Sequence, residues 1–97
     1  MPTTDRVVEP TGQFRRDWKR ENKGRYHVRL RTDFEAVLAM LRADAELPPQ
    51  YRDHQLGSQW QDCRDLHLRP DLILTYSTPD AGTLRLIRLG SHSELGL

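Results

Sequence analysis

The hydrophobic positions of this chain change their period between its two halves. In the N-terminal half they recur at helical spacing, whereas in the C-terminal half they alternate or run together as in β-strands. The clearest helical stripe has apolar residues at i, i+4, i+7, i+8 and i+11: Leu30, Phe34, Val37, Leu38 and Leu41. The stripe predicts a helix that ends by about Ala45, before two consecutive prolines. Its start is either near Val28 or at a capping box formed by Thr32 and Glu35.

An earlier helix is predicted from Thr11, as the N-cap, to about Lys23, because a glycine follows there. Phe14 and Trp18 form its apolar face. The apolar alternation in the connection, over residues 26–30, also permits a short strand. Two helices joined by a short link predict an antiparallel helical hairpin that packs on a sheet.

Four short strands are predicted, one before the helices and three after them: 6–9, 63–69, 72–77 and 83–89. Residues 48–61 lack periodicity and predict a loop, and residues 78–82 carry hairpin turn chemistry. In the last strand the apolar phase slips at Leu86 and Ile87, which predicts burial on both faces or a β-bulge. The order β-α-α-β-β-β predicts one α+β domain over residues 1–97, with the last three strands as an antiparallel meander.

The size and composition narrow the class of protein. The chain has 97 residues and one cysteine, Cys63, so no internal disulfide can form. The N-terminus has no signal-like apolar region, and no stretch approaches the roughly 20 apolar residues of a membrane span. We therefore expect a cytoplasmic protein that makes no membrane contact.

Charge is distributed unevenly although the net charge is only +1. Residues 15–31 contain eight basic and two acidic side chains, which leaves the rest of the chain net acidic. Lys19, Arg20 and Lys23 belong to this basic segment. It is either a solvated helix face or a surface for RNA or an acidic protein partner.

The candidate chemistry lies in the C-terminal half, which holds three of the four histidines. The set is His54, His67, Asp71 and His92. Strand alternation places His67 with Asp65 on the face opposite the leucines. Each residue alone has an ordinary structural explanation, and together they also resemble a zinc site, although no pair has a tight ligand spacing. Several imidazoles and a carboxylate on one small sheet suggest acid–base chemistry without a cofactor.

An ordered series of motifs covers the C-terminal half. Leu-Pro-Pro-x-Tyr-Arg-Asp-His-x-Leu spans 47–56, Trp60 follows, Arg-Asp-x-His-x-x-Pro-Asp-Leu-Ile-Leu-x-Tyr spans 64–76, and Arg-Leu-Gly-Ser-His-Ser-Glu-Leu spans 88–95. In this order and at these gaps the chain resembles the YafQ branch of the RelE superfamily of toxin–antitoxin ribonucleases. The resemblance implies a RelE-like fold, a small antiparallel sheet packed against an N-terminal helical hairpin.

The same resemblance implies a toxin that cleaves mRNA in the A site of the 70S ribosome and is restrained by a cognate antitoxin of ribbon-helix-helix type. The family's active-site positions fall on His54, His67, Asp71 and His92, and its basic residue near the scissile phosphate falls on Arg88. Some relatives place an aromatic residue where this chain has Gly96, which puts base stacking there in doubt.

The mechanism expected from these residues uses no metal and no cofactor. His92 is the predicted acid, Asp71 or His67 the base, and His54 orients or shares the base role. RNA contacts are predicted for a set of basic and aromatic residues: Arg88, Arg64, Trp60, Lys19, Arg20 and Lys23. Trp60 is equally explained as a loop anchor in the core. The alternatives are a ParE-like toxin that targets gyrase and a non-catalytic RNA- or ribosome-binding module.

Overall fold

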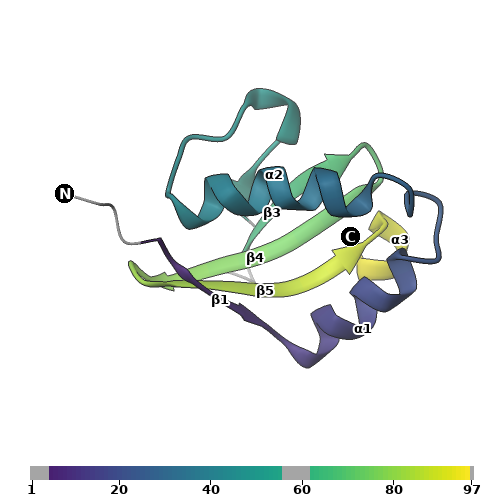
Figure 1. Ribbon diagram of the computed structural model, residues 1–97, viewed down its shortest axis with the longest axis horizontal. Helices are drawn as coiled ribbons and strands as arrows, with labels where there is room; N and C mark the ends of the chain where they lie inside the picture. The colour runs from purple at the N-terminus through teal and green to yellow at the C-terminus, as the bar shows by residue number, and fades with distance from the viewer. Residues whose placement is uncertain (1–4, 56–61, 97) are drawn as a thin grey trace.

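The fold is a five-stranded sheet in the order β1-β5-β4-β3-β2, with helices on one face and along one edge (Figure 1). The computed structural model describes residues 5–55 and 62–96. The elements are β1 (Val7–Pro10), α1 (Gly12–Glu21), α2 (Leu30–Arg42), the 3-10 turn η1 (Pro49–Tyr51), β2 (His54–Gln55), β3 (Arg64–Arg69), β4 (Leu72–Asp80), β5 (Thr83–Gly90) and α3 (His92–Leu95).

The sheet is mixed rather than wholly antiparallel. Strands β3, β4 and β5 form the predicted antiparallel meander. Strand β1 instead pairs in parallel with β5, and β2 adds an antiparallel edge within the segment predicted to be a loop. A two-residue strand has no periodicity to detect, so only its partner β3 reveals it. Strand β4 also extends to Asp80, which shortens the predicted turn.

The phase slip in the last strand is a β-bulge. Thr75 pairs with Arg88, but the next residue of β4, Tyr76, pairs with Leu86, so Ile87 is left over. Because β5 has one extra residue here, the side chains after the bulge point to the opposite sheet face from the one that strict alternation would give them. The bulge therefore allows Leu86 and Leu89 both to be buried, and it sets the face on which Arg88 lies.

Helix α2 covers one face of the sheet with the predicted stripe, of which Leu30, Phe34, Val37 and Leu41 are buried. The helix begins at Leu30 after Arg29, which makes no side-chain cap. The predicted capping box is therefore wrong, and the connection before the helix is a turn rather than a strand. The leucines of β3, β4 and β5 complete the core beneath α2.

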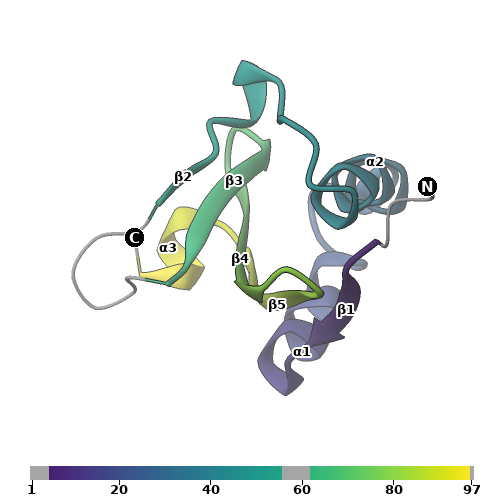
Figure 2. The same cartoon turned by 90° about the vertical axis from the view of Figure 1, so that its left-hand side faces the viewer.

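Helix α1 continues the edge of the sheet where β1 ends. Thr11 caps it by accepting from the Phe14 N–H at 3.0 Å, as predicted. Because β1 pairs with β5 only as far as Leu86, the backbone of Leu89 lacks a strand partner on that side. Asp17 accepts the Leu89 N–H at 2.9 Å, and Arg20 donates to the Leu89 carbonyl at 2.6 Å. Figure 2 shows α1 beside β1 and β5.

None of the helices in the described ranges is both long and apolar enough to traverse a bilayer.

Candidate active site

The structure brings the four predicted site residues together on the sheet face that α2 does not cover. His54 comes from β2, His67 from β3, Asp71 from the β3–β4 turn and His92 from the first turn of α3. The ring centroids of His54 and His67 lie 6.4 Å apart, and those of His67 and His92 lie 5.4 Å apart. Spacing along the chain permitted this convergence, and the strand pairings produce it.

His92 and Asp71 form the tightest pair of this cluster. One carboxylate oxygen of Asp71 accepts both the His92 Nδ1–H at 2.7 Å and the His92 backbone N–H at 3.1 Å. These two hydrogen bonds, together with the nearby Arg25 cation, lower the pKa of Asp71. The pair is about half exposed, so it is accessible to a large substrate.

The helix that carries His92 is itself stabilised at both ends by its local sequence. Ser91 and Glu94 form a reciprocal capping box at the start of α3. Gly96 ends the helix with φ of +74°, a left-handed conformation that glycine adopts without steric cost. Gly96 thus has a structural use as a helix stop.

All three imidazoles use Nδ1 to bind an oxygen acceptor. His54 Nδ1 lies 2.8 Å from the Arg52 carbonyl oxygen, and His67 Nδ1 lies 3.3 Å from that of Pro70. A carbonyl or carboxylate oxygen cannot donate, so Nδ1 carries the proton in each ring. Within residues 5–55 and 62–96, no Nε2 atom of the cluster has a hydrogen-bond partner. The three Nε2 atoms are therefore the ones available to substrate.

Asp65 is a site residue whose burial the strand alternation did not reveal. It shares the face of His67 as predicted, but it is buried at 2% exposure, and Thr75 donates to it at 2.8 Å. Burial raises its pKa, partly offset by the Thr75 hydrogen bond and by the charges of the three cluster histidines. A buried carboxyl group therefore lies beneath the imidazoles. Its burial depends on the pairing of β2 and β4 with β3, so the sequence of β3 alone could not show it.

Arg88 lies on this same face, because it pairs across the sheet with Thr75, which in turn pairs with Asp65. Its Nε donates to Asp17 at 2.8 Å, and 28% of its side chain is exposed. Arg88 is therefore a cation held in place by Asp17 and still partly accessible to solvent on the sheet face that carries the histidines.

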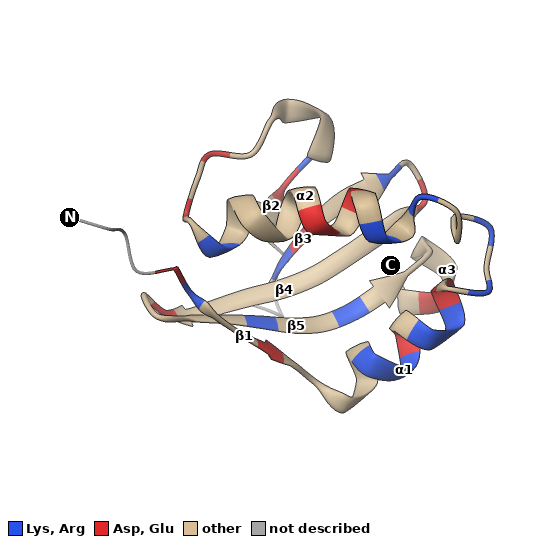
Figure 3. Cartoon of the chain, viewed as in Figure 1, with Lys and Arg blue, Asp and Glu red and all other residues tan. Residues whose placement is uncertain are grey.

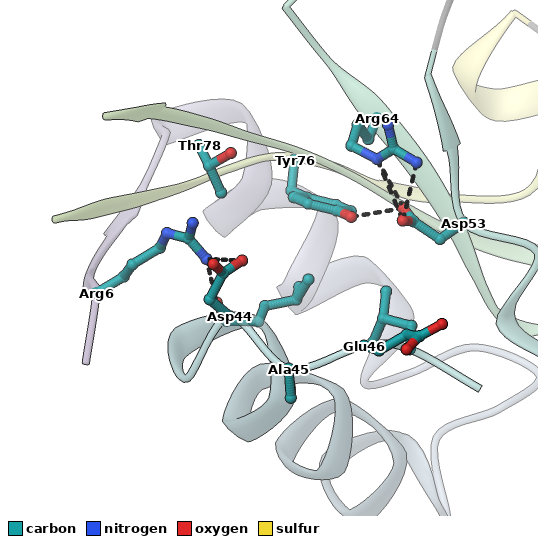
Figure 4. A pocket seen from close by; sticks show the side chains of 10 residues that line it. Arg6, Asp44, Ala45, Glu46, Asp53, Arg64, Tyr76 and Thr78 are labelled. Carbon is teal, nitrogen blue, oxygen red and sulfur yellow. Dashed lines mark hydrogen bonds and ion pairs between the residues drawn. The ribbon is translucent and has the colours of Figure 1, made fainter. Parts of the chain in front are cut away.

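Arg64 lies on the opposite face, away from the histidines. Its guanidinium binds the Asp53 carboxylate through two nitrogens, at 3.0 and 3.2 Å, and Tyr76 donates its hydroxyl to the same carboxylate at 2.5 Å. Figure 4 shows the three side chains meeting at the wall of a cavity of about 310 Å³. Burial, then the Asp53 carboxylate, raises the pKa of Tyr76 well above its usual range. The placement does not support Arg64 as a phosphate ligand.

Asp53, Arg64 and Tyr76 form the Asp53 clamp, which lies on the sheet face opposite the histidines. Because His54 directly follows Asp53, the clamp also holds the start of β2 in place. We expect Tyr76→Phe to lower the free energy of unfolding by about 1 kcal/mol, because it removes one hydrogen bond, and to slow RNA cleavage severalfold by loosening His54. Urea unfolding and initial cleavage rates measure the two effects. The stability control is Tyr51→Phe, whose hydroxyl makes no hydrogen bond within the described ranges. Unchanged cleavage in a destabilised Tyr76→Phe protein would contradict the link to His54.

The other predicted RNA contacts are distributed differently. All three guanidinium nitrogens of Arg20 are engaged, by Asp17, Glu21, Glu94 and the Leu89 carbonyl, so Arg20 ties α1 to β5 and α3. Lys19 borders an apolar groove beside β1, and Lys23 is exposed in the turn after α1. Trp60 lies outside the described residues.

Arg25 is a basic residue near the cluster that the sequence did not single out. It lines a depression of about 200 Å³ together with Asp71 and Ser91, and its charge helps to lower the pKa of Asp71. Figure 3 shows basic residues along the α1–α2 connection, close to α3. Nothing in the local sequence distinguishes Arg25 from its basic neighbours, because its position depends on the fold of the connection.

The described ranges contain no group of three or more His, Cys, Asp or Glu side chains arranged to hold a metal ion. The zinc site that the composition of the set allowed therefore has no support among these residues.

A small mixed sheet that carries an exposed cluster of imidazoles beside fixed arginines defines a protein of the RelE-like toxin class. The family of YafQ bacterial toxins of type II toxin–antitoxin systems matches residues 6–96, so the chain belongs to that family. The resemblance seen in the sequence is thereby confirmed.

Individual relatives agree over nearly the whole chain. It is 36% identical to the mRNA interferase toxin YafQ of Escherichia coli strain B/BL21-DE3, over 93% of this chain and 95% of that protein. The crystal structure of YafQ from the same strain has a TM-score of 0.81 at 34% identity, covering 93% and 97% of the two chains. The E. coli DinJ–YafQ complex matches with a TM-score of 0.77 at 34% identity and the same coverage.

Proposed function

We propose that this chain is a ribosome-dependent endoribonuclease that cleaves mRNA by acid–base attack of the ribose 2′-hydroxyl on the adjacent phosphate. The observation that carries the proposal is the set of three imidazoles whose Nδ1 atoms are all engaged and whose Nε2 atoms are open. An imidazole titrates near the pH of the cell, so one neutral and one protonated ring supply a base and an acid together.

His92 is the proposed acid. The Asp71 carboxylate accepts from its Nδ1–H and so orients the ring, and the Nε2–H of the protonated ring is the proton given to the departing 5′-oxygen. Asp71, with its lowered pKa and its oxygen already accepting twice from His92, orients this acid. The proposal therefore takes Asp71 out of the base role that the sequence left open.

His67 is the proposed base, because its ring is the neighbour of His92 and its Nε2 bears the lone pair. It removes the 2′-hydroxyl proton, the oxygen bonds to phosphorus, and the bond from phosphorus to the 5′-oxygen breaks. The products are a 2′,3′-cyclic phosphate and a free 5′-hydroxyl. Arg88 supplies positive charge for the phosphorane, and His54 orients the 2′-hydroxyl from the far side of His67.

The openness of the cluster supports dependence on the ribosome. His92 and Asp71 are 46% and 47% exposed, so the described residues enclose little of a flexible RNA strand and do not by themselves hold it in line for attack. A ribosomal A site supplies that orientation, and the basic side chains around the cluster bind the phosphates of the RNA. The proposed setting is the cytoplasm, and the proposed restraint is a cognate antitoxin, as in the E. coli complex.

The test is cleavage of an mRNA held in the A site of purified 70S ribosomes. We expect cleavage with a 2′,3′-cyclic phosphate end, and loss of cleavage when the nucleotide before the cut carries a 2′-deoxy sugar, because the nucleophile is then missing. Cleavage should also be at least about a hundredfold slower without ribosomes, since orientation is a large part of the barrier.

Full cleavage of the 2′-deoxy substrate would contradict the mechanism. Toxicity without mRNA cleavage, with loss of DNA supercoiling by purified gyrase, would favour the ParE-like alternative. Salt-dependent ribosome binding without cleavage would favour the binding module.

A further inference from the structure

Arg52 has an unusual backbone conformation just before the strand that carries His54. Its φ and ψ are 49° and 41°, in the left-handed region. Among the residues that the structure describes, only one other non-glycine residue has a positive φ: Asp44, at 55°. Aspartate is one of the few residue types enriched in this region, and Asp44 directly follows the C-cap of α2, where helices commonly adopt it. Arginine has no such preference, so the conformation of Arg52 calls for a local explanation.

Contacts on both sides hold Arg52 in this conformation. Before it, the turn η1 closes with a hydrogen bond from the Arg52 N–H to the Pro49 carbonyl at 3.0 Å, and Tyr51 packs against the core. After it, Asp53 is bound by the guanidinium of Arg64 at 3.0 Å. A residue in a sparsely populated backbone conformation persists only where its surroundings over-determine it, and such residues gather at functional sites. Arg52 lies between two anchored neighbours, next to the histidine cluster.

The left-handed conformation determines where the Arg52 carbonyl points. Its oxygen lies 2.8 Å from Nδ1 of His54, two residues later. In an extended strand the carbonyl groups lie in the plane of the sheet and the side chains stand perpendicular to it, so such a carbonyl would not face this ring. The left-handed residue turns its carbonyl out of that plane. The unusual backbone of Arg52 therefore makes the hydrogen bond to His54 possible.

This hydrogen bond decides which nitrogen of His54 can act on a substrate. A neutral imidazole carries its proton on either nitrogen, and a carbonyl oxygen can only accept, so the proton is held on Nδ1 and the lone pair on Nε2. His54 is exposed, and within the described ranges the Arg52 carbonyl is the hydrogen-bond partner of its ring. Without that carbonyl, solvent would allow both tautomers and several ring orientations.

The side chain of Arg52 offers a separate explanation for the residue type. It is exposed and lines a depression of about 450 Å³ together with His67 and Arg69, where a guanidinium can meet an RNA phosphate. A cation at this position needs no left-handed backbone, however. The conformation and the charge of Arg52 are therefore two properties, which substitutions can separate.

We propose that Arg52 is a positioning residue of the ribonuclease site: its left-handed backbone presents the carbonyl oxygen to Nδ1 of His54 and so keeps Nε2 as an acceptor for the ribose 2′-hydroxyl. Fixing the tautomer of a catalytic imidazole through its other nitrogen is an established way to keep it competent. The inference rests on the proposed function only for the part that His54 plays in cleavage, because the tautomer is a property of the free toxin.

The experiment compares Arg52→Asn with Arg52→Val. Both remove the guanidinium and are similar in size, but asparagine tolerates the left-handed region and a β-branched residue does not. The ¹⁵N shifts of the His54 ring, measured at about pH 8.5 where an imidazole is neutral, show which nitrogen carries the proton. We expect Nδ1–H in the unmodified toxin and in Arg52→Asn, and a mixture of tautomers in Arg52→Val. The His54 signals are assigned by their loss in His54→Gln.

Cleavage on 70S ribosomes is the second readout. We expect single-turnover cleavage by Arg52→Val to be at least about fivefold slower than by Arg52→Asn, a part of the contribution of a positioned catalytic group. Any difference between Arg52→Asn and the unmodified toxin reports the lost guanidinium instead. Asp44→Asn and Asp44→Val are the controls, because they make the same pair of changes at the other left-handed residue. Both should keep the His54 tautomer and the cleavage rate of the unmodified toxin.

Three results would overturn the inference: a His54 proton on Nε2 in the unmodified toxin, equal tautomer populations in Arg52→Asn and Arg52→Val, or equal cleavage rates of these two variants. The first of these needs no variant, so it does not depend on whether Arg52→Val folds. Absence of cleavage by an unmodified toxin whose His54 carries its proton on Nδ1 would instead contradict the proposed function. The two failures are therefore distinguishable.

Discussion

Replacing His92 by Ala should slow mRNA cleavage on the ribosome by about 10²–10⁴-fold, the usual contribution of a positioned acid. The Asp71 carboxylate orients the ring through its Nδ1–H, and no other group within the described ranges bonds to that ring. The free energy of unfolding should barely change, because the side chain is 46% exposed and lies outside the core. Single-turnover cleavage and urea unfolding measure the two quantities.

A modified substrate separates an acid from a merely structural histidine. When sulfur replaces the 5′-oxygen of the cut bond, the leaving group departs as a thiolate and needs no proton. We expect this substrate to restore the His92→Ala toxin to near the rate of the unmodified toxin, and not to restore His67→Ala, whose proposed step is at the other oxygen. His27→Ala is the control, since His27 is exposed and lies in the α1–α2 connection. Failure of the sulfur substrate to rescue His92→Ala would show that His92 is not the acid.

Replacing Asp17 by Ala should lower the free energy of unfolding by about 3–5 kcal/mol, the effect of removing one partner from a buried ion pair. Asp17 is fully buried, and its carboxylate binds Arg88, Arg20 and the Leu89 N–H. Its loss leaves the Leu89 N–H without an acceptor, because β1 pairs with β5 only as far as Leu86. Because the free energy of unfolding of a protein is only about 5–15 kcal/mol, this substitution would remove a large part of it.

Urea unfolding tests this prediction, with Asp44→Ala as the control. Asp44 also pairs with an arginine, Arg6, but it is 82% exposed, so its change should stay within about 1 kcal/mol. Asp17→Asn should fall between the two, because the amide oxygen still accepts the Leu89 N–H. Equal stabilities of Asp17→Ala and Asp44→Ala would contradict the role given to Asp17.

The same carboxylate gives stability a defined pH dependence. Burial alone would raise the pKa of Asp17, but the hydrogen bonds from Arg88 and the Leu89 N–H outweigh it and lower the pKa below 3.8. The folded state therefore binds this proton less readily than the unfolded state does. The contribution is complete above about pH 4 and is lost as the pH falls through the lowered pKa. The unmodified protein should lose stability below pH 4 more steeply than Asp17→Asn does.

The chain shows which parts of a site can be predicted from sequence. The positions of His54, His67, Asp71 and His92 carried enough family signal to be chosen, and strand alternation placed His67 on the correct face. Alternation also placed Asp65 on the face of His67, but it did not show that Asp65 is buried there, with β2 and β4 on either side. Alternation gives the face of a side chain but not what covers that face.

The basic residues show the same limit. Arg64, Arg20 and Arg88 are indistinguishable as charges in the sequence. The tertiary structure uses Arg64 to hold Asp53 and Arg20 to hold the end of β5, and it binds Arg88 to Asp17 on the sheet face that carries the histidines. The role of each arginine depends on the acid that it binds. Arg64 binds an acid 11 positions away in the chain, Arg20 binds one 3 positions away, and Arg88 binds one 71 positions away.

The sequence by itself determined the order of β1, α1, α2, β3, β4 and β5, the buried stripe of α2, the antiparallel meander and the phase slip in β5, because these depend on periods of 2 and 3.6 residues that short segments contain in full. Only the tertiary structure decided the parallel pairing of β1, the two-residue strand that carries His54, the burial of Asp17 and Asp65, and the engagement of every Nδ1. Each of these depends on atoms from distant segments meeting within hydrogen-bond distance, and no local pattern encodes such a meeting.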